Sequence, residues 1–208
     1  MWPYNYYCCP YHWIFAVDTN PSMGFNLIKV WIIRWWFKWW LWWWWCPQKV
    51  STFGFCSSVS AYEEFVWRPL MNPILPPGFS SPVTNYAVAI IKALQLVVRY
   101  SRMNQCVFIF SDGGDNRFDS VEIEIWNFVR RNCLRCDLCV QCFFMRNFPF
   151  QAVPTNFART CRDIGSGPLG TVYTNDNPWI VASQLRRLAW NKVWNQQCPC
   201  RSYFYGFR

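Results

Sequence analysis

Two short oxygen-rich segments carry the side chains of this sequence that are best suited to chemistry. Asp-Thr-Asn-Pro-Ser-Met-Gly occupies residues 18–24, and Ser-Asp-Gly-Gly-Asp occupies residues 111–115. Their carboxylates, amides and hydroxyls are hard oxygen donors, which suit Mg²⁺, Mn²⁺ or Ca²⁺. Each segment directly follows an apolar run, at residues 13–17 and 106–110.

These two apolar runs predict strands that are buried on both faces. They are rich in β-branched and aromatic residues and end abruptly at Asp or Ser, as the strands of parallel sheets do. In open parallel sheets, ligands bind just beyond the carboxyl ends of the strands, at the topological switch point. We therefore expect both oxygen-rich segments to meet at one edge of a sheet.

The rest of the chain alternates between strand and helix patterns. We expect strands at 12–17, 49–55, within 58–67, and at 106–110, 137–144 and 170–173, and helices at 25–45, 84–100, 119–132, 156–164 and 177–193. This alternation predicts an α/β fold with a doubly wound, mostly parallel central sheet flanked by helices. The 208 residues allow one domain, which we place at 12–190 between tails at 1–11 and 191–208.

Three motifs in this order resemble the von Willebrand factor type A domain, across residues 12–190. The family has an Asp-x-Ser-x-Ser loop after its first strand, a Thr in a later loop, and an Asp-Gly pair after a central strand. Here these are Asp18-Thr19-Asn20-Pro21-Ser22, then Thr84 at the start of the 84–94 segment, and Asp112-Gly113. The closing segments 165–173 and 185–189 are also similar to the last strand and helix of the family.

The resemblance implies a metal-ion-dependent adhesion site. Its ligands would be Asp18, Ser22, Thr84 and Asp112, with Asn20 standing where the family has Ser. An amide oxygen can bind a hard cation, but it is larger than a hydroxyl and shifts the geometry. The expected cation is Mg²⁺ (or Mn²⁺ or Ca²⁺), and an acidic side chain of a protein partner would complete its shell. In the alternative, Asp18 merely accepts backbone N–H bonds in an empty loop.

Net charge points to a second class of partner. The chain carries 20 Lys and Arg against 11 acidic residues, a balance of +9. Such a balance favours polyanions, so a nucleic acid such as RNA is also considered. The alternative function is therefore a structural subunit of a large ribonucleoprotein or organellar assembly, with a degenerate metal site.

The predicted helix at 25–45 is unusually rich in tryptophan. Lys29, Arg34 and Lys38 interrupt it, and Trp prefers the membrane interface to the hydrocarbon, so we expect no transmembrane span. A surface helix would leave several Trp exposed, which marks a contact with a partner or a membrane surface. On the sequence alone, docking in a protein assembly is favoured over a membrane surface.

The 12 cysteines include a C-x2-C-x2-C-x2-C run at Cys133, Cys136, Cys139 and Cys142. An iron–sulfur or zinc site is disfavoured, because the ferredoxin spacing is not matched and a strand would point Cys139 and Cys142 to opposite faces. No signal peptide opens the sequence. We expect an intracellular, reducing compartment, an organelle included, with most thiols as small buried hydrophobes.

Common catalytic patterns are absent from the sequence, so we do not expect an enzyme. His12 is the single histidine, which leaves no well-placed Ser-His-Asp or Cys-His pair, and we expect it to be structural. No G-x-x-x-x-G-K-[ST] phosphate loop occurs. Asp115 and Asp119 are expected to be helix caps or solvated loop acids.

Overall fold

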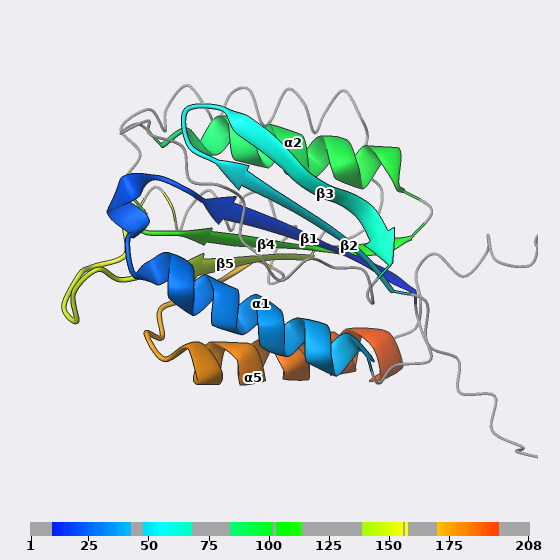
Figure 1. The fold of residues 1–208 in the computed structure, drawn as a ribbon. Coiled ribbons are helices and arrows are strands. Elements are labelled where there is room, and N and C mark those ends of the chain that lie inside the picture. Colours follow the sequence, from blue (N-terminus) through cyan, green and yellow to red (C-terminus); the bar gives the residue numbers. More distant parts are fainter. Residues whose placement is uncertain are drawn as a thin grey trace, which may run out of the picture.

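The structure is a computed structural model built around one six-stranded sheet in the order β3-β2-β1-β4-β5-β6 (Figure 1). It describes residues 10–42, 48–67, 84–101, 103–113, 139–155, 157 and 170–195. The strands are β1 (Tyr11–Asp18), β2 (Gln48–Phe55), β3 (Val59–Trp67), β4 (Asn104–Ser111), β5 (Cys139–Phe144) and β6 (Gly170–Tyr173). All neighbouring pairs are parallel except β2 and β3. The mostly parallel α/β fold predicted from the sequence is therefore confirmed.

β1 and β4 form the centre of this sheet, and every residue of both strands is buried. Successive side chains point to opposite faces, so Phe15 contributes to the core on one face while Ile14 and Ala16 contribute to the core on the other. Burial on both sides explains why the sequence runs are continuously apolar rather than alternating.

Helices cover both faces of the sheet. α1 (Asn26–Trp42) and α5 (Pro178–Trp190) lie side by side on one face, and α2 (Tyr86–Arg99) lies on the other (Figure 1). Asn85 caps α2 by accepting the Val88 N–H (3.4 Å), and Asn177 caps α5 by accepting the Trp179 N–H (3.0 Å). A 3-10 turn (Pro21–Met23) precedes α1, and a π-helical turn (Asn191–Asn195) follows α5. The two caps lie at or next to residues 84 and 177, where the sequence predicted these helices to begin.

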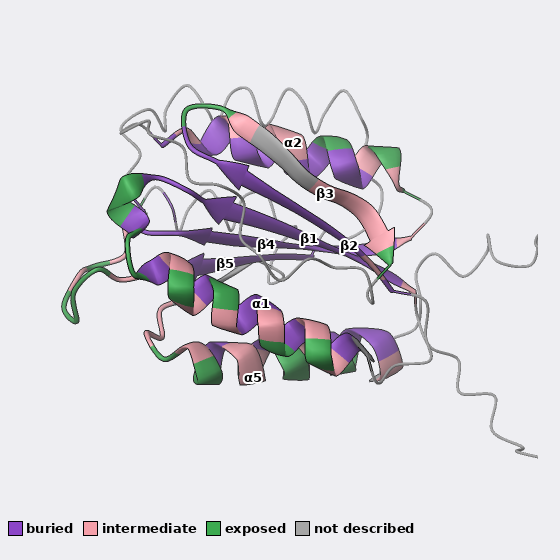
Figure 2. Ribbon diagram, viewed as in Figure 1, coloured by how far each residue is buried: buried purple, intermediate pink, exposed green. Residues whose placement is uncertain are grey.

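Arg34 of α1 differs from its sequence interpretation as a charge that interrupts a surface helix. Its side chain is fully buried, and its Nη2 donates to Thr52 Oγ1 (3.1 Å) and lies 3.8 Å from Glu63 Oε2. The guanidinium is therefore paired beneath the helix, against β2 and β3. Lys29 and Lys38, both half-buried, are left as the cations of α1 that reach solvent. The helix as a whole alternates between buried and exposed segments along its length (Figure 2).

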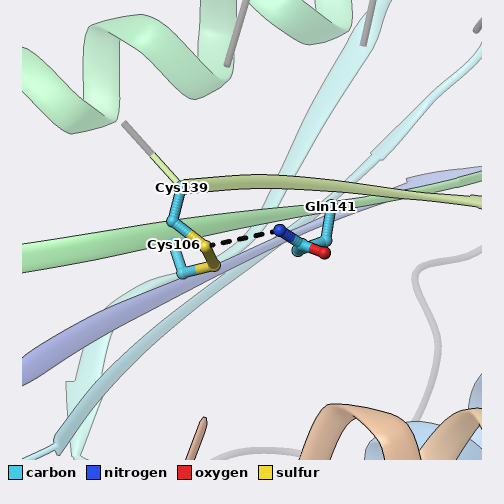
Figure 3. The surroundings of a disulfide bond; sticks show 3 residues. All are labelled: Cys106, Cys139 and Gln141. Carbon is cyan, nitrogen blue, oxygen red and sulfur yellow. Dashed lines mark hydrogen bonds between the residues drawn. A yellow bond between two sulfur atoms is a disulfide. The ribbon is translucent and has the colours of Figure 1, made fainter. Parts of the chain in front are cut away.

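A disulfide joins Cys106 of β4 to Cys139 of β5, contrary to the expectation of unpaired thiols. The two residues are register partners in adjacent parallel strands, with Cα atoms 4.5 Å apart, so the sheet itself brings the sulfurs together. Gln141 Nε2 donates to Cys139 Sγ over 3.8 Å (Figure 3). Cys142 lies in the core on the other face, which confirms the alternation and separates it from Cys139 as a cluster ligand.

Tyr11 belongs to β1 and Val193 is buried in the core, while the domain limits of 12–190 stay a prediction. Several expectations lie outside the described residues: the helix 119–132, Asp115 and Asp119, Cys133 and Cys136, most of the 156–164 helix, residues 165–169 of the closing segment, and most of both tails. The predicted compartment stays a prediction.

Candidate metal centre

The sheet brings the predicted ligands together at the carboxyl end of its central strands. β1 ends at Asp18, and its neighbour β4 ends directly before Asp112. The segment that carries Thr84 is tied to the same edge, because the Asn85 N–H donates to the carbonyl of Cys56, one residue past β2 (2.8 Å). Three segments far apart in the sequence thus converge where β1, β2 and β4 end.

Asp18 lies at the bottom of this site with no exposed surface. Its Oδ1 accepts the Asn20 N–H (2.9 Å), and its Oδ2 accepts the Ser111 hydroxyl (2.7 Å). Burial raises the pKa of Asp18 to about 7; the bonds from Ser111, Asn20 and Thr84 lower it, and the nearby Asp112 carboxylate raises it further. The hydrogen bonds of the protein thus do not fully offset the cost of burying the ionised carboxylate. We call this carboxylate under-compensated, and a cation would stabilise it.

Asn20 joins two of the predicted ligands through its side-chain amide. Its Nδ2 donates to Thr84 Oγ1 (2.8 Å), and its Oδ1 accepts the Ser22 N–H (3.0 Å), which caps the 3-10 turn. The side chain is nearly buried. In this arrangement Asn20 holds Thr84 and the turn of Ser22 in place, while its oxygen is already engaged by a backbone donor.

Asp112 supplies a second buried carboxylate. Its Oδ2 accepts from Asn147 Nδ2 (3.1 Å), and its Oδ1 is buried with no hydrogen-bond partner in the part of the chain that the structure describes. A buried carboxylate oxygen without a donor is costly unless a cation or water contacts it. This orphaned oxygen, close to the under-compensated Asp18, fits a divalent cation.

Ser22 gives the site an open side. Unlike Asp18, Thr84 and Asp112, it is exposed, in the 3-10 turn that leads into α1. Within the described residues, no three His, Cys, Asp or Glu side chains gather as a metal-binding group. The donor set is therefore two carboxylates with neutral hydroxyls, which suits a hard cation rather than a thiolate- or imidazole-bound metal.

Several residues of the site were not singled out from the sequence. The Ser111 hydroxyl contacts the hydroxyl of Tyr86 and donates to Asp18, and Asn147 contacts Asp112 and accepts from Asn26 Nδ2 (2.7 Å). Ser111 lies inside the 111–115 motif and could have been chosen for its hydroxyl. Nothing in the local sequence marks Asn147, which reaches the site from beyond β5.

Gly113 holds the Asp112 loop in a conformation that other residues cannot easily adopt. Its φ is +86°, and an added Cβ would lie 2.7 Å from both Phe144 and Pro154 side chains. Both the left-handed backbone and the close packing require glycine here. The Asp-Gly pair of the motif is thus explained by backbone geometry as well as by its carboxylate.

His12 lies at the other end of β1 and takes no part in this site. It is buried, its Nε2 is 2.7 Å from Ser51 Oγ, and burial lowers its pKa to about 3. The predicted structural role of His12 is consistent with this neutral, buried ring.

Comparison with known proteins gives a result for structure but not for sequence. No family model and no curated protein matches the sequence. The fold is similar to a von Willebrand factor type A protein from Catenulispora acidiphila (TM-score 0.65, 10% identity, 88% of this chain and 43% of that chain). It is also similar to proximal thread matrix protein 1 from the mussel byssus, in a structure with a zinc-occupied metal-ion-dependent adhesion motif (TM-score 0.58, 12% identity, 88% and 46%).

A third similar structure is the ArnB paralog VWA2 from Sulfolobus acidocaldarius (TM-score 0.58, 14% identity, 86% of this chain and 44% of that chain). The chain spans less than half the length of each of these three proteins. The likeness shows the von Willebrand factor type A fold, as the sequence motifs predicted.

Proposed function

We propose that this chain, which has the fold of a von Willebrand factor type A domain, is a non-enzymatic module that binds a protein partner through a divalent cation. Mg²⁺ is the expected ion, held by Asp18, Ser22, Thr84 and Asp112 at the end of β1 and β4. The observation that carries the proposal is the buried, unpartnered Oδ1 of Asp112 close to the under-compensated carboxylate of Asp18.

The donor set determines what this site does. Two carboxylates and two hydroxyls leave a divalent ion able to accept one further oxygen ligand from outside the chain. When bound, the cation supplies an electrophilic position that a carboxylate of the partner can occupy. The exposed turn of Ser22 leaves a path to that position, whereas Asp18 and Asp112 are shielded by the sheet edge.

The hydrogen bonds between these residues pre-organise the site. Ser111 holds one oxygen of Asp18, and Asn147 holds one oxygen of Asp112. Side chains that are fixed before the ion arrives lose less conformational entropy on binding. Such outer contacts typically change metal affinity by about 10- to 100-fold when removed.

The direct test is isothermal titration of the purified chain with Mg²⁺ and with Mn²⁺. We expect saturable binding that Asp112→Asn abolishes. Glu64→Gln is the matched control, because it removes one carboxylate from β3, where Glu64 pairs with Lys92 and Arg99. Wild-type protein that binds neither ion, or Asp112→Asn protein that binds as well as wild type, would remove the cation from the proposal.

The partner is then tested by capture of acidic peptides. A library of Asp- and Glu-containing peptides is panned on immobilised chain in Mg²⁺ and in EDTA. Peptides that are retained only with Mg²⁺, and are lost in Asp112→Asn, support recognition through the ion. Retention that EDTA does not change would show that the partner is bound elsewhere.

The second candidate is a structural subunit of a larger assembly, with a degenerate metal site. It is favoured by one observation: the Asn20 amide already satisfies the Ser22 N–H and the Thr84 hydroxyl without an ion. This candidate predicts that the melting temperature is the same in Mg²⁺ and in EDTA.

A further inference from the structure

The outer surface of the α1 and α5 layer carries most of the exposed large apolar side chains in the described part of the chain. We define the tryptophan face by Ile28, Trp31, Trp36 and Trp39 of α1 and Trp179 and Trp190 of α5, which are 39–54% exposed. Phe25, directly before α1, and Ile180 of α5 extend it. Exposed apolar surface that runs along two adjacent helices marks a contact surface.

The tryptophan face is hollowed along the line where the two helices meet. A groove of about 560 Å³ lies there, lined by Trp35, Trp36 and Trp39 of α1 and by Trp179 and Arg186 of α5, among others. Trp36 and Trp179, which both line it, pack edge to face with ring centroids 5.2 Å apart. The contact surface is therefore continuous between the helices.

The charges on this layer are all of one sign. α1 and α5 contain no Asp or Glu, whereas Lys29, Lys38, Arg186 and Arg187 reach solvent between the aromatic side chains. Arg34, the remaining cation of these two helices, is buried and paired below. An occupant of the tryptophan face must therefore be apolar where it meets the rings and anionic where it meets the cations.

A second copy of the chain does not satisfy this requirement. A two-fold contact would place the same patch on both sides, so the four cations of one copy would face those of the other with no acid from α1 or α5 to pair them. A nucleic acid would supply anions, but Ile28, Ile180 and Phe25 would then be covered by a polar backbone. The sequence favoured docking in a protein assembly over a membrane surface because of exposed Trp alone. The charges now found among these Trp residues favour the membrane surface instead.

We infer that the tryptophan face binds the surface of a bilayer that contains anionic lipids. Trp combines a large apolar ring with a polar N–H and is enriched at the membrane–water interface, where it can satisfy both. Helices that lie in this plane combine such an apolar face with Lys and Arg that attract anionic headgroups. No helix in the described part of the chain has both the length and the apolarity to traverse a bilayer.

This mode of binding leaves the metal site accessible. The tryptophan face is the outer side of a helix layer, whereas Asp18 and Asp112 lie at the end of the sheet, near the start of α1 (Figure 1). A chain lying on its α1 and α5 layer would present the open side of Ser22 along the membrane plane. Membrane contact and the proposed cation therefore occupy different surfaces and can be tested separately.

The test is flotation of the full chain with vesicles, carried out in EDTA so that no divalent ion contributes. We expect the chain to float with vesicles of phosphatidylcholine mixed with phosphatidylglycerol, and to bind far less to phosphatidylcholine alone. Arg186→Gln/Arg187→Gln should weaken binding to the anionic vesicles about 25-fold, at about fivefold for each cation removed. Trp39→Gln/Trp190→Gln should weaken it at least about tenfold.

The matched control is Phe150→Gln, which removes a 95% exposed aromatic ring far along the chain from both helices. It should float like wild type, and all variants should keep the wild-type circular dichroism melt. Wild-type protein that fails to float, or Phe150→Gln protein that loses as much binding as Trp39→Gln/Trp190→Gln, overturns the inference. So does a dimer or a bound RNA oligonucleotide that Trp39→Gln/Trp190→Gln releases while vesicle binding persists.

Discussion

The side-chain amide of Asn20 donates a hydrogen bond to the hydroxyl of Thr84, with 2.8 Å between Nδ2 and Oγ1, and so joins two loops that lie 64 residues apart. The von Willebrand factor type A family, which the motifs resemble, has Ser at the position of Asn20. The substitution thus replaces a small hydroxyl with a longer group that bridges to the second loop. Asn20 thus hydrogen-bonds to both loops without an ion, and this predicts a measurable cost to cation binding.

Asn20→Ser should raise the affinity of the chain for Mg²⁺ by about fivefold, because a hydrogen bond worth about 1 kcal/mol no longer competes with the ion for Thr84. The shorter side chain releases the Thr84 hydroxyl and can offer its own oxygen to the ion. Titration calorimetry measures the affinity, and the melting temperature in EDTA should fall, because a buried hydrogen bond is lost at a cost of about 1 kcal/mol. Weaker Mg²⁺ binding by Asn20→Ser would show that the amide oxygen itself is a ligand.

Asp18 should make the ion-free protein less stable as the pH rises. Its pKa rises from 3.8 in the unfolded chain to about 7 in the folded chain, mainly through burial, so between these values the folded state holds an extra proton. The Asp18 contribution should therefore lower the free energy of unfolding by up to about 4 kcal/mol from pH 4 to pH 7. Denaturant titration in EDTA of wild type and Asp18→Asn isolates it as the difference between the two proteins. A difference that is constant with pH would contradict the raised pKa.

His12 should act in the opposite direction. Burial lowers its pKa from 6.5 to about 3, so the unfolded chain takes up a proton that the folded chain refuses, and stability is lost as the pH falls below about 6.5. In Asp18→Asn the opposing contribution of Asp18 is absent, so the free energy of unfolding should rise by about 3 kcal/mol from pH 4 to pH 6.5. His12→Gln in the same background should abolish that rise. In wild type, the two residues should nearly cancel over this range.

The Cys106–Cys139 disulfide should contribute substantially to stability. It links residues 33 apart. Closing a loop of that size removes conformational entropy from the unfolded chain and so raises its free energy by about 4 kcal/mol. Cys106→Ala/Cys139→Ala should lose about this much free energy of unfolding in urea titrations. Cys56→Ala is the control, because Cys56 is buried and free, so its loss should reflect packing alone. Equal losses in the two variants would show that the bond adds nothing beyond packing.

Sequence patterns predicted the elements well because their causes are local. Continuous apolar runs marked the doubly buried strands β1 and β4, and the polar residues at 84–85 and 177 marked the starts of α2 and α5. The order of the three motifs then placed Asp18, Thr84 and Asp112 at the ends of elements that a parallel sheet must align. Their convergence follows from the parallel direction of the strands, which the alternation of strands and helices along the sequence predicts.

Contacts between distant segments could not be obtained in this way, because they depend on strand order and register. Asn147 reaches Asp112 from beyond β5, and Arg34, on the buried side of α1 beside Ile33, donates to Thr52 of β2. Cys106 meets Cys139 only because β4 and β5 are adjacent and in register.

The sequence by itself determined the fold class and the order of the described elements, since hydrophobic period and capping residues act over a few positions, and from their order it predicted the oxygen donors. The tertiary structure alone decided how those donors are hydrogen-bonded, which charges are buried, and that the cations of α1 and α5 share one face with the tryptophans. These depend on packing between segments that the chain places far apart.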